Sequence, residues 1–198
     1  MNSSEKDFSV GSVKRRIIAQ AIPLTAAQIV HLLYNVVDRI YIGHLPGDSD
    51  MALTGLGITF PVIVLIAAFT NLFGSGGTAL FSIARGKREE ETAEKILGNV
   101  FSLLFISSIL LFSLCYFLRR PILMLFGASQ VSVQYADEYL QIYLFGTAFS
   151  MLATGLNGYI NAQGFPKTGM MTTMIGAVIN IVLDPIFIFY FHMGVRGA

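Results

Sequence analysis

The sequence predicts an all-α integral membrane protein, a polytopic bundle of transmembrane helices. Only 13% of the 198 residues are charged, whereas about 25% are charged in a typical soluble domain. Mean hydropathy is +0.66 and the formal net charge is +1. This composition excludes an ordinary soluble enzyme, a disordered tail and a nucleic-acid-binding module. It offers no electrostatic argument about partners, and a single cysteine, Cys115, excludes a disulfide framework.

Five long stretches without a charged residue predict the membrane-spanning helices. An α-helix needs about 20 apolar residues to cross the hydrocarbon core, and each stretch is long enough. None alternates as barrel strands do. The stretches are residues 17–37, 51–84, 96–118, 139–166 and 168–195, the last interrupted by Asp184. A further uncharged stretch, residues 121–136, contains proline, glycine, serine and glutamine and is interpreted as an interfacial turn and helix.

The distribution of basic residues predicts the orientation in the membrane. With a cytoplasmic amino terminus, three basic residues lie outside and nine inside, and Arg39 lies in the outer part of the first helix. The outer three are Arg119, Arg120 and Arg196; the inner nine are Lys6, Lys14, Arg15, Arg16, Arg85, Lys87, Arg88, Lys95 and Lys167. The positive-inside rule favours this orientation. We therefore expect a cytoplasmic tail over residues 1–16 and a transmembrane bundle over residues 17–198.

The odd number of helices leaves the carboxyl end outside. Residues 194–198 are typical of the approach to another helix. No small-residue cleavage site follows the first apolar stretch, which predicts that the first helix is retained. We interpret the sequence as a fragment.

Polar side chains recur at helical spacing on four of the predicted helices. Residues three or four positions apart share one face of a helix, and we expect these faces to avoid lipid by pointing at a shared hydrated cavity. Alternatively, serine and threonine bond to carbonyls of their own helix or support close packing. The stripes are Gln28, His31, Asn35 and Asp38; Asn71, Ser75, Thr78 and Ser82; Tyr143, Thr147, Ser150, Thr154, Asn157 and Asn161; and Thr173, Asn180 and Asp184.

Asp38 and Asp184 are the strongest functional candidates. Burying an aspartate in a bilayer costs several kcal/mol, and such residues usually mark an ion or substrate path. At 1.5 Å per residue, Asp38 lies about 7 Å and Asp184 about 10 Å below the outer ends of their helices. The two carboxylates are therefore predicted at nearly the same depth.

Asn180 lies one helical turn inward of Asp184 on the same face. Pro185 lacks a backbone N–H, so the carbonyl of Ile181 is predicted to be free beside these side chains. Two carboxylates, a carboxamide and a carbonyl form an all-oxygen set that suits a hard cation. The same crowding of negative charge would favour a carboxyl group that holds a proton. A bound hard cation and a bound proton are therefore both consistent with these residues.

Proline and glycine residues indicate where the predicted helices can bend or approach one another closely. Pro23 lies about four turns inward of Asp38 and would kink the first helix. The sequence Gly74-Ser-Gly-Gly77 allows another backbone to approach the second helix closely, or allows that helix to bend.

These residues resemble the multidrug and toxic compound extrusion (MATE) family of transporters. The most specific match is Asn180-Ile-Val-Leu-Asp-Pro185 with the apolar residues after it. Asn157-Gly-Tyr-Ile-Asn161, Asp38 with Ile40-Tyr-Ile-Gly43, and Pro23 also resemble family patterns, and the similarity covers nearly the whole chain. Asn161 departs from the family, where many members have arginine.

The resemblance implies a twelve-helix carrier made of two six-helix bundles around a central cavity. This chain would be most of the amino-terminal bundle, ending before its sixth helix. The implied function is antiport rather than enzymatic catalysis: export of cationic or amphipathic organic compounds across the cell membrane, driven by sodium ions or protons. The implied partners are membrane lipids and the carboxyl-terminal bundle, with no nucleic acid and no cofactor beyond the coupling ion.

By the same resemblance, Asp38, Asn180 and Asp184 match positions that couple transport to a cation, and they would be the sodium ligands if sodium is used. Bending of the first helix at Pro23 would link ion binding to movement. The candidates for a cation or substrate path are Gln28, His31, Asn35, Tyr143, Thr154 and Asn157.

Three other functions fit parts of the pattern. A lipid-linked sugar or oligosaccharide flippase shares the architecture but favours a more cationic cavity, and only Arg39 is an intramembrane cation candidate here. An intramembrane aspartyl protease would use two aspartates, but Leu183-Asp184-Pro185 stands where that family is expected to have Gly-x-Gly-Asp. In a helical module that does not transport, the stripes would be packing faces.

Overall fold

The structure, a computed structural model, describes residues 13–45 and 49–197. Each of its five α-helices is long and apolar enough to cross a membrane, the fifth with its extension to Tyr190. The predicted all-α bundle of five spans is therefore confirmed. The helices are α1 (Val13–Gly43), α2 (Ser49–Gly86), α3 (Glu90–Leu125), α4 (Ser132–Ala162) and α5 (Pro166–Pro185), followed by a π-helical turn η2 (Ile186–Tyr190) and a 3-10 turn η3 (Gly194–Gly197).

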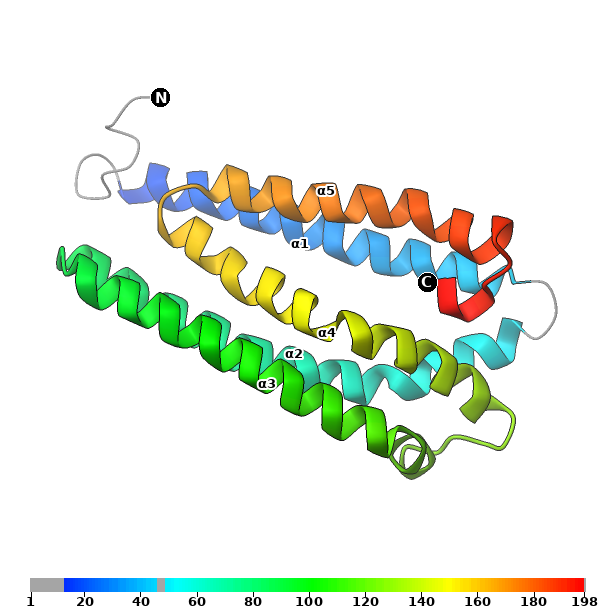
Figure 1. Ribbon diagram of the computed structural model, residues 1–198. Helices are drawn as coiled ribbons and strands as arrows, with labels where there is room; N and C mark the ends of the chain where they lie inside the picture. Colours follow the sequence, from blue (N-terminus) through cyan, green and yellow to red (C-terminus); the bar gives the residue numbers. More distant parts are fainter. Residues whose placement is uncertain (1–12, 46–48, 198) are drawn as a thin grey trace.

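Successive helices run in opposite directions and are joined by short connections (Figure 1). We call the end of the bundle where α1, α3 and α5 begin the proximal end, and the end where they finish the distal end. Because they are the first and fifth elements of this series, α1 and α5 run parallel, and Figure 1 shows them side by side.

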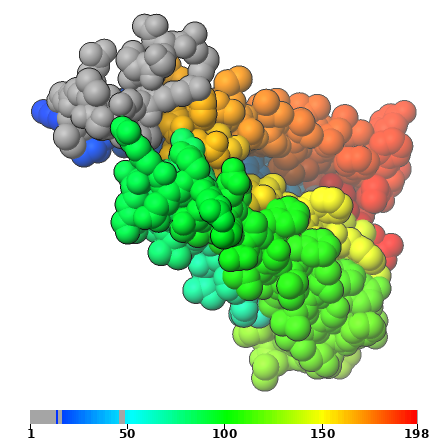
Figure 2. Space-filling view, turned by 60° about the vertical axis from the view of Figure 1, so that its left-hand side comes forward, coloured from blue at the N-terminus to red at the C-terminus, as the bar shows by residue number. Residues whose placement is uncertain are grey.

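The helices form two groups. Helices α2, α3 and α4 pack on one another, while α1 packs mainly along α5. The main apolar core lies within the three-helix group and includes Leu104, Leu140 and Met151, all fully buried. In the space-filling view, α4 (yellow) is visible between α3 (green) and α5 (orange) (Figure 2). The pair and the trio are therefore joined chiefly along α4 and at the distal end.

A smaller apolar cluster joins the two groups at the distal end. Ile42 of α1, Ala52 of α2, Ile188 of η2 and Val195 of η3 are all buried within it. Because these four residues come from both groups, the cluster holds the pair and the trio together at the distal end.

One expected boundary is wrong, and another stays a prediction. Helix α1 begins at Val13 and its candidate membrane span begins at Ile17, while most of the predicted tail, residues 1–16, lies outside the described residues. Residues 121–136 form no separate interfacial helix: α3 continues through Pro121 to Leu125, where Leu123 is fully buried, and α4 begins at Ser132. The chain turns through Gly127, at a φ of 91° that favours glycine, before α4 begins.

Helices α2 and α4 cross in backbone contact. A Cβ atom on Gly74 would lie 2.8 Å from the Cα atom of Gly155, so neither helix could approach so closely with a side chain there. A Cβ atom on Gly77 would collide with the Tyr159 hydroxyl and with Val100. The packing interpretation of the glycine-rich sequence is therefore confirmed at Gly74 and Gly77.

Candidate cation-coupling site

Asp38, Asn180 and Asp184 lie between α1 and α5 in the distal half of the bundle. Asp184 is 4% exposed, and the other two side chains are half-buried. The Asn180 Nδ2 atom donates a hydrogen bond to Asp184 Oδ1 at 2.9 Å. Asp38 is close enough for its charge to act on Asp184. The parallel packing of α1 and α5 explains this approach, because both aspartates lie near the carboxyl ends of their helices.

Three buried oxygen atoms of this site have no hydrogen-bond partner within the described ranges. They are Asp38 Oδ1, Asn180 Oδ1 and Asp184 Oδ2. Buried polar atoms are almost always paired, and leaving one unpaired costs about 1–3 kcal/mol, more for a charged group. Arg39 is exposed and makes no ion pair with Asp38 in this part of the chain. Oxygens from two carboxylates and one carboxamide are ligands that a sodium ion accepts, and a proton on either carboxyl would supply the missing donor.

The carbonyl of Ile181 is not free as the sequence predicts. The Tyr41 hydroxyl donates a hydrogen bond to it at 3.5 Å. Pro185 releases this carbonyl from the helix, as expected, but Tyr41 lies three residues after Asp38 and therefore on the side of α1 that meets α5. The backbone then forms the π-helical turn η2 directly after Pro185. Such turns occur often at functional sites.

Several tyrosines surround the carboxylates. Asp38 acts electrostatically on Tyr34 of α1 and Tyr139 of α4, and the rings of Tyr139 and Tyr143 stack with centroids 6.0 Å apart. Sequence reasoning selected Tyr143 but missed Tyr34, Tyr41 and Tyr139. Tyr34 is four residues from Asp38, and Tyr139 is four residues from Tyr143, so helical spacing held the signal for both.

His31, Tyr34 and Asn35 form an exposed hydrogen-bonded group on α1. Asn35 Nδ2 donates to the His31 carbonyl at 2.7 Å and lies 3.3 Å from His31 Nδ1. Because Nδ2 is a donor, we infer that Nδ1 is the acceptor and that Nε2 carries the proton. Nε2 lies 3.1 Å from the Tyr34 hydroxyl and would donate to it.

The polar stripes of α2 and α4 share a groove of about 320 Å³ between the two helices. Asn71, Ser75, Thr78 and Ser82 line it from α2, and Thr154 lines it from α4. No residue of α1 or α5 lines this groove, and a cavity shared by all four stripes stays a prediction. Residue spacing shows which side chains share a helix face but not which neighbouring helix that face meets. Helix α1 packs mainly along α5 rather than along α2 or α4. Gln28 stays exposed on α1.

The hydroxyls of the stripes bond to carbonyls of their own helices, as the alternative interpretation predicts. Thr78, Ser82 and Thr154 each donate to the carbonyl four residues earlier, at 2.7, 2.8 and 2.6 Å. Thr147 does the same at 3.3 Å and is buried.

Asn157 and Asn161 lie at the proximal end, against α5. Asn157 Nδ2 donates to the Gly169 carbonyl at 3.2 Å and to the Thr172 hydroxyl at 2.8 Å. Asn161 Nδ2 lies 3.4 Å from Asn157 Oδ1, to which it donates. These contacts tie α4 to the first turns of α5, at the opposite end of α5 from the carboxylates.

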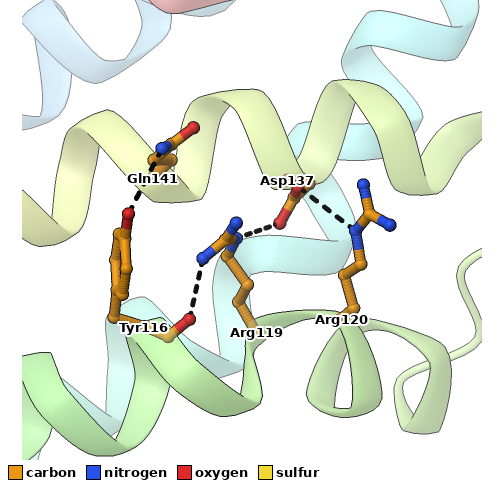
Figure 3. A network of polar contacts seen from close by, with 5 residues as sticks. All are labelled: Tyr116, Arg119, Arg120, Asp137 and Gln141. Atoms are coloured by element: carbon orange, nitrogen blue, oxygen red, sulfur yellow. Dashed lines mark hydrogen bonds and ion pairs between the residues drawn. The ribbon is translucent and has the colours of Figure 1, made fainter.

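A second charged cluster joins α3 and α4 at the distal end (Figure 3). Asp137 pairs with Arg119 at 2.5 Å and with Arg120 at 3.5 Å. The Arg119 guanidinium donates to the Tyr116 carbonyl at 2.9 Å and lies 4.7 Å from the centre of the Tyr116 ring. Gln141 donates to the Tyr116 hydroxyl at 3.5 Å. Each carboxylate oxygen of Asp137 therefore forms an ion pair with one arginine.

Comparisons with known proteins identify the family of this chain. The sequence model of the family described as MatE matches residues 23–186, a range that includes Asp38, Asn180 and Asp184. The chain belongs to the MatE family. The resemblance to MATE transporters is therefore confirmed. Because MatE is a family of transporters rather than enzymes, the aspartyl protease alternative is removed.

Curated relatives and solved MATE structures match at least 94% of the chain but extend well beyond it. The multidrug export protein MepA of Staphylococcus haemolyticus is 27% identical over 192 residues, which cover 96% of this chain and 42% of MepA. The structure of the MATE multidrug transporter DinF-BH, solved in complex with a ligand, matches with a TM-score of 0.89 at 32% identity, covering 100% of this chain and 44% of that one. A crystal structure of MATE in the straight conformation has a TM-score of 0.87 at 28% identity and covers 94% and 41%, respectively. The chain thus spans less than half the length of these proteins.

Proposed function

We propose that this MatE chain is the amino-terminal bundle of a cation-coupled antiporter that exports cationic or amphipathic organic compounds. The observation that supports it most is the group of three unpartnered buried oxygens of Asp38, Asn180 and Asp184. A second, carboxyl-terminal bundle of six helices would complete the cavity. The similarity to multidrug export proteins supports the class of substrate.

In this proposal the amino terminus is cytoplasmic, so the distal end faces outside and the carboxylates lie close to the source of the coupling ion. Binding of a sodium ion or a proton removes the repulsion between Asp38 and Asp184 and satisfies their unpartnered oxygens. A carrier needs two packings with different affinities for the ion. Inward movement of one positive charge supplies about 2.3 kcal/mol per 100 mV of membrane potential.

The other predicted site residues take supporting roles. Gln28, His31 and Asn35 would face the substrate path from α1, and Tyr143 would border it from α4. Asn157 would keep α4 and α5 together at the proximal end, and Thr154 would meet the substrate in the groove beside α2. Pro23, buried within α1, would let this helix bend as the site fills.

The test is ion-driven efflux by the full-length protein in proteoliposomes. We expect Asp184→Asn and Asp38→Asn to abolish it while membrane insertion stays intact. Asp50→Asn is the matched control, because Asp50 is exposed at the start of α2 and should leave efflux unchanged. Separate sodium and proton gradients assign the coupling ion. Undiminished driven efflux by Asp184→Asn would remove this site from the mechanism.

A further inference from the structure

We infer that Arg120, near the distal end of α3, binds the phosphate of an anionic phospholipid whose acyl chains lie along the exposed side of the same helix. The inference concerns the contact of the bundle with the bilayer, so it does not depend on the proposed transport function. It rests on the depth of Arg120, its unused hydrogen-bond donors, the charge around it and the apolar surface beside it.

Arg120 lies at the depth of the lipid headgroups. Residues 96–118 of α3 carry no charge, and at 1.5 Å per residue they span about 34 Å, close to the thickness of the hydrocarbon core. Arg119 and Arg120 follow directly, and the helix continues to Leu125. The two arginines therefore lie where the acyl chains of the nearer leaflet end and its phosphates begin.

The protein uses the hydrogen-bond donors of the two arginines differently. Arg119 is 24% exposed, and its donors serve Asp137 and the Tyr116 carbonyl. Arg120 is 76% exposed, and its only ion pair within the described ranges joins Nε to Asp137 at 3.5 Å. Figure 3 shows the two terminal nitrogens of Arg120 turned away from Asp137. These nitrogens are available to a ligand, and the planar guanidinium fork fits two oxygens of one phosphate.

The charge of the cluster favours an anion. Arg119 and Arg120 supply two positive charges and Asp137 one negative charge, which leaves +1. The other ion pair that the structure describes at this end, Arg196 with Glu138 at 3.6 Å, is neutral in sum. A lipid with a single net negative charge, such as phosphatidylglycerol, balances the excess. A zwitterionic lipid brings an ammonium group of its own, which the guanidinium repels.

An apolar strip of α3 leads from the middle of the membrane to Arg120. We call it the α3 strip; its members, all exposed, are Ile106, Leu110, Leu114 and Phe117. They are three or four positions apart and share one face of the helix with Arg120, three residues beyond Phe117. The buried residues of α3 lie on its opposite side, against α2 and α4. A soluble phosphate would use only the guanidinium, whereas a lipid uses both the guanidinium and the strip.

The experiment places a fluorescent reporter at Phe117, which is 80% exposed. This chain contains no tryptophan, so Phe117→Trp adds one beside Arg120, and the parent protein corrects for tryptophans elsewhere in the full-length protein. The full-length variant is reconstituted in phosphatidylethanolamine vesicles that contain increasing fractions of phosphatidylglycerol with brominated acyl chains. Bromine quenches tryptophan only at short range, so quenching reports which lipid occupies the α3 strip. Brominated phosphatidylethanolamine in the reverse mixture gives the reference.

We expect phosphatidylglycerol to be preferred about fivefold at this position, since one basic residue near anionic headgroups contributes about 1 kcal/mol, a factor of about five. Phe117→Trp/Arg120→Gln should lose this preference. The variant should fold, because Asp137 keeps its pair with the buried Arg119; an unchanged thermal midpoint checks this. Phe117→Trp/Arg196→Gln is the matched control. It removes the same charge from the same end of the bundle, where Arg196 is already paired with Glu138, and should keep the preference.

Three outcomes would overturn the inference. Equal quenching by the two lipids in Phe117→Trp would show that Arg120 selects no anionic lipid. An equal loss of preference in the Arg120→Gln and Arg196→Gln variants would show a general effect of charge rather than a site at Arg120. Relief of quenching by inorganic phosphate, with sodium chloride of the same ionic strength as the reference, would identify a site for soluble anions instead of a lipid.

Discussion

Two clusters of acidic side chains in the distal half of this bundle have opposite surroundings. The Asp137 side chain is 13% exposed and pairs with two arginines, one of which stacks on Tyr116. Asp184 is 4% exposed, receives one carboxamide hydrogen bond and faces a second carboxylate, Asp38. Asp137 is thus paired with two arginine cations. In the carboxylate pair, no described residue donates to Asp38 Oδ1 or Asp184 Oδ2.

The difference separates a structural cluster from one suited to exchange. A buried charge must be compensated, and fixed guanidinium groups do this permanently for Asp137. No described residue compensates the unpartnered oxygens of Asp38 and Asp184, which agrees with the proposed exchange of a coupling ion. The arginine-paired cluster holds α3 on α4, whereas in the proposed function the state of the carboxylate pair between α1 and α5 changes during a transport cycle.

Breaking the paired cluster should have the largest effect on stability. Asp137→Asn leaves Arg119 without its buried counter-ion, which we expect to lower the free energy of unfolding by about 3 kcal/mol. Thermal unfolding in detergent, followed by circular dichroism, measures this change. Glu138→Gln is the control: its 3.6 Å pair with Arg196 is half exposed and worth less than about 1 kcal/mol. Similar losses for both variants would mean that burial does not distinguish the two pairs.

Adding the coupling ion should stabilise the protein only through the carboxylate pair, Asp38 and Asp184. At about 100 times the dissociation constant, the coupling ion should stabilise the parent protein by about 2.7 kcal/mol. In Asp38→Asn and Asp184→Asn this stabilisation should disappear, because the ligand set is incomplete. If the coupling ion is sodium, unfolding measured in sodium chloride and in choline chloride, at one pH, reveals this stabilisation; if it is a proton, unfolding is compared at two pH values instead. Persistent sodium-specific stabilisation in both variants would place the ion elsewhere.

Without the coupling ion, removing one carboxylate of the pair should change the free energy of unfolding in the opposite direction to Asp137→Asn. Asp184→Asn keeps an oxygen that accepts from Asn180 but removes the repulsion with Asp38. We expect its free energy of unfolding in choline chloride to be equal to that of the parent or about 1 kcal/mol higher. A loss comparable to that of Asp137→Asn would show that the carboxylate pair is a stabilising element after all.

The smallest effect is expected at Tyr41. Tyr41→Phe removes a single long hydrogen bond to the Ile181 carbonyl, which should lower the stability by about 0.5 kcal/mol. Chemical denaturation with a series of repeat measurements can resolve this difference. A loss of several kcal/mol would indicate that this contact holds α5 on α1 far more strongly than its length suggests.

The sequence predicts the spans well because the bilayer imposes one requirement on all of them: about 20 residues without a charge. It also predicts that Asp38 and Asp184 lie at similar depth, because depth follows from counting residues along a helix. Counting does not reveal which helices are neighbours. For this reason the division into a pair and a trio, and the separation of the α2–α4 groove from the carboxylates, appear only in the structure.

Side chains at the ends of helices were harder to interpret from the sequence. Arg119 and Arg120 served as markers of orientation, but their pairing with Asp137 depends on how α4 returns beside α3. Tyr34 and Tyr139 have helical spacing to Asp38 and Tyr143, but spacing alone does not show that these two tyrosines lie beside the carboxylates. Pro185 correctly indicated a released carbonyl, and only the packing of α1 showed that Tyr41 takes it.

The contact between Gly74 and Gly155 limits how this protein can diversify. A single added methyl group at Gly74 would meet the backbone of α4, so we expect folding to exclude substitutions at this position. The groove-lining residues Asn71, Ser75 and Thr154 have no such limit, since they are exposed. Substitutions should therefore be tolerated at these three positions and not at Gly74 and Gly155.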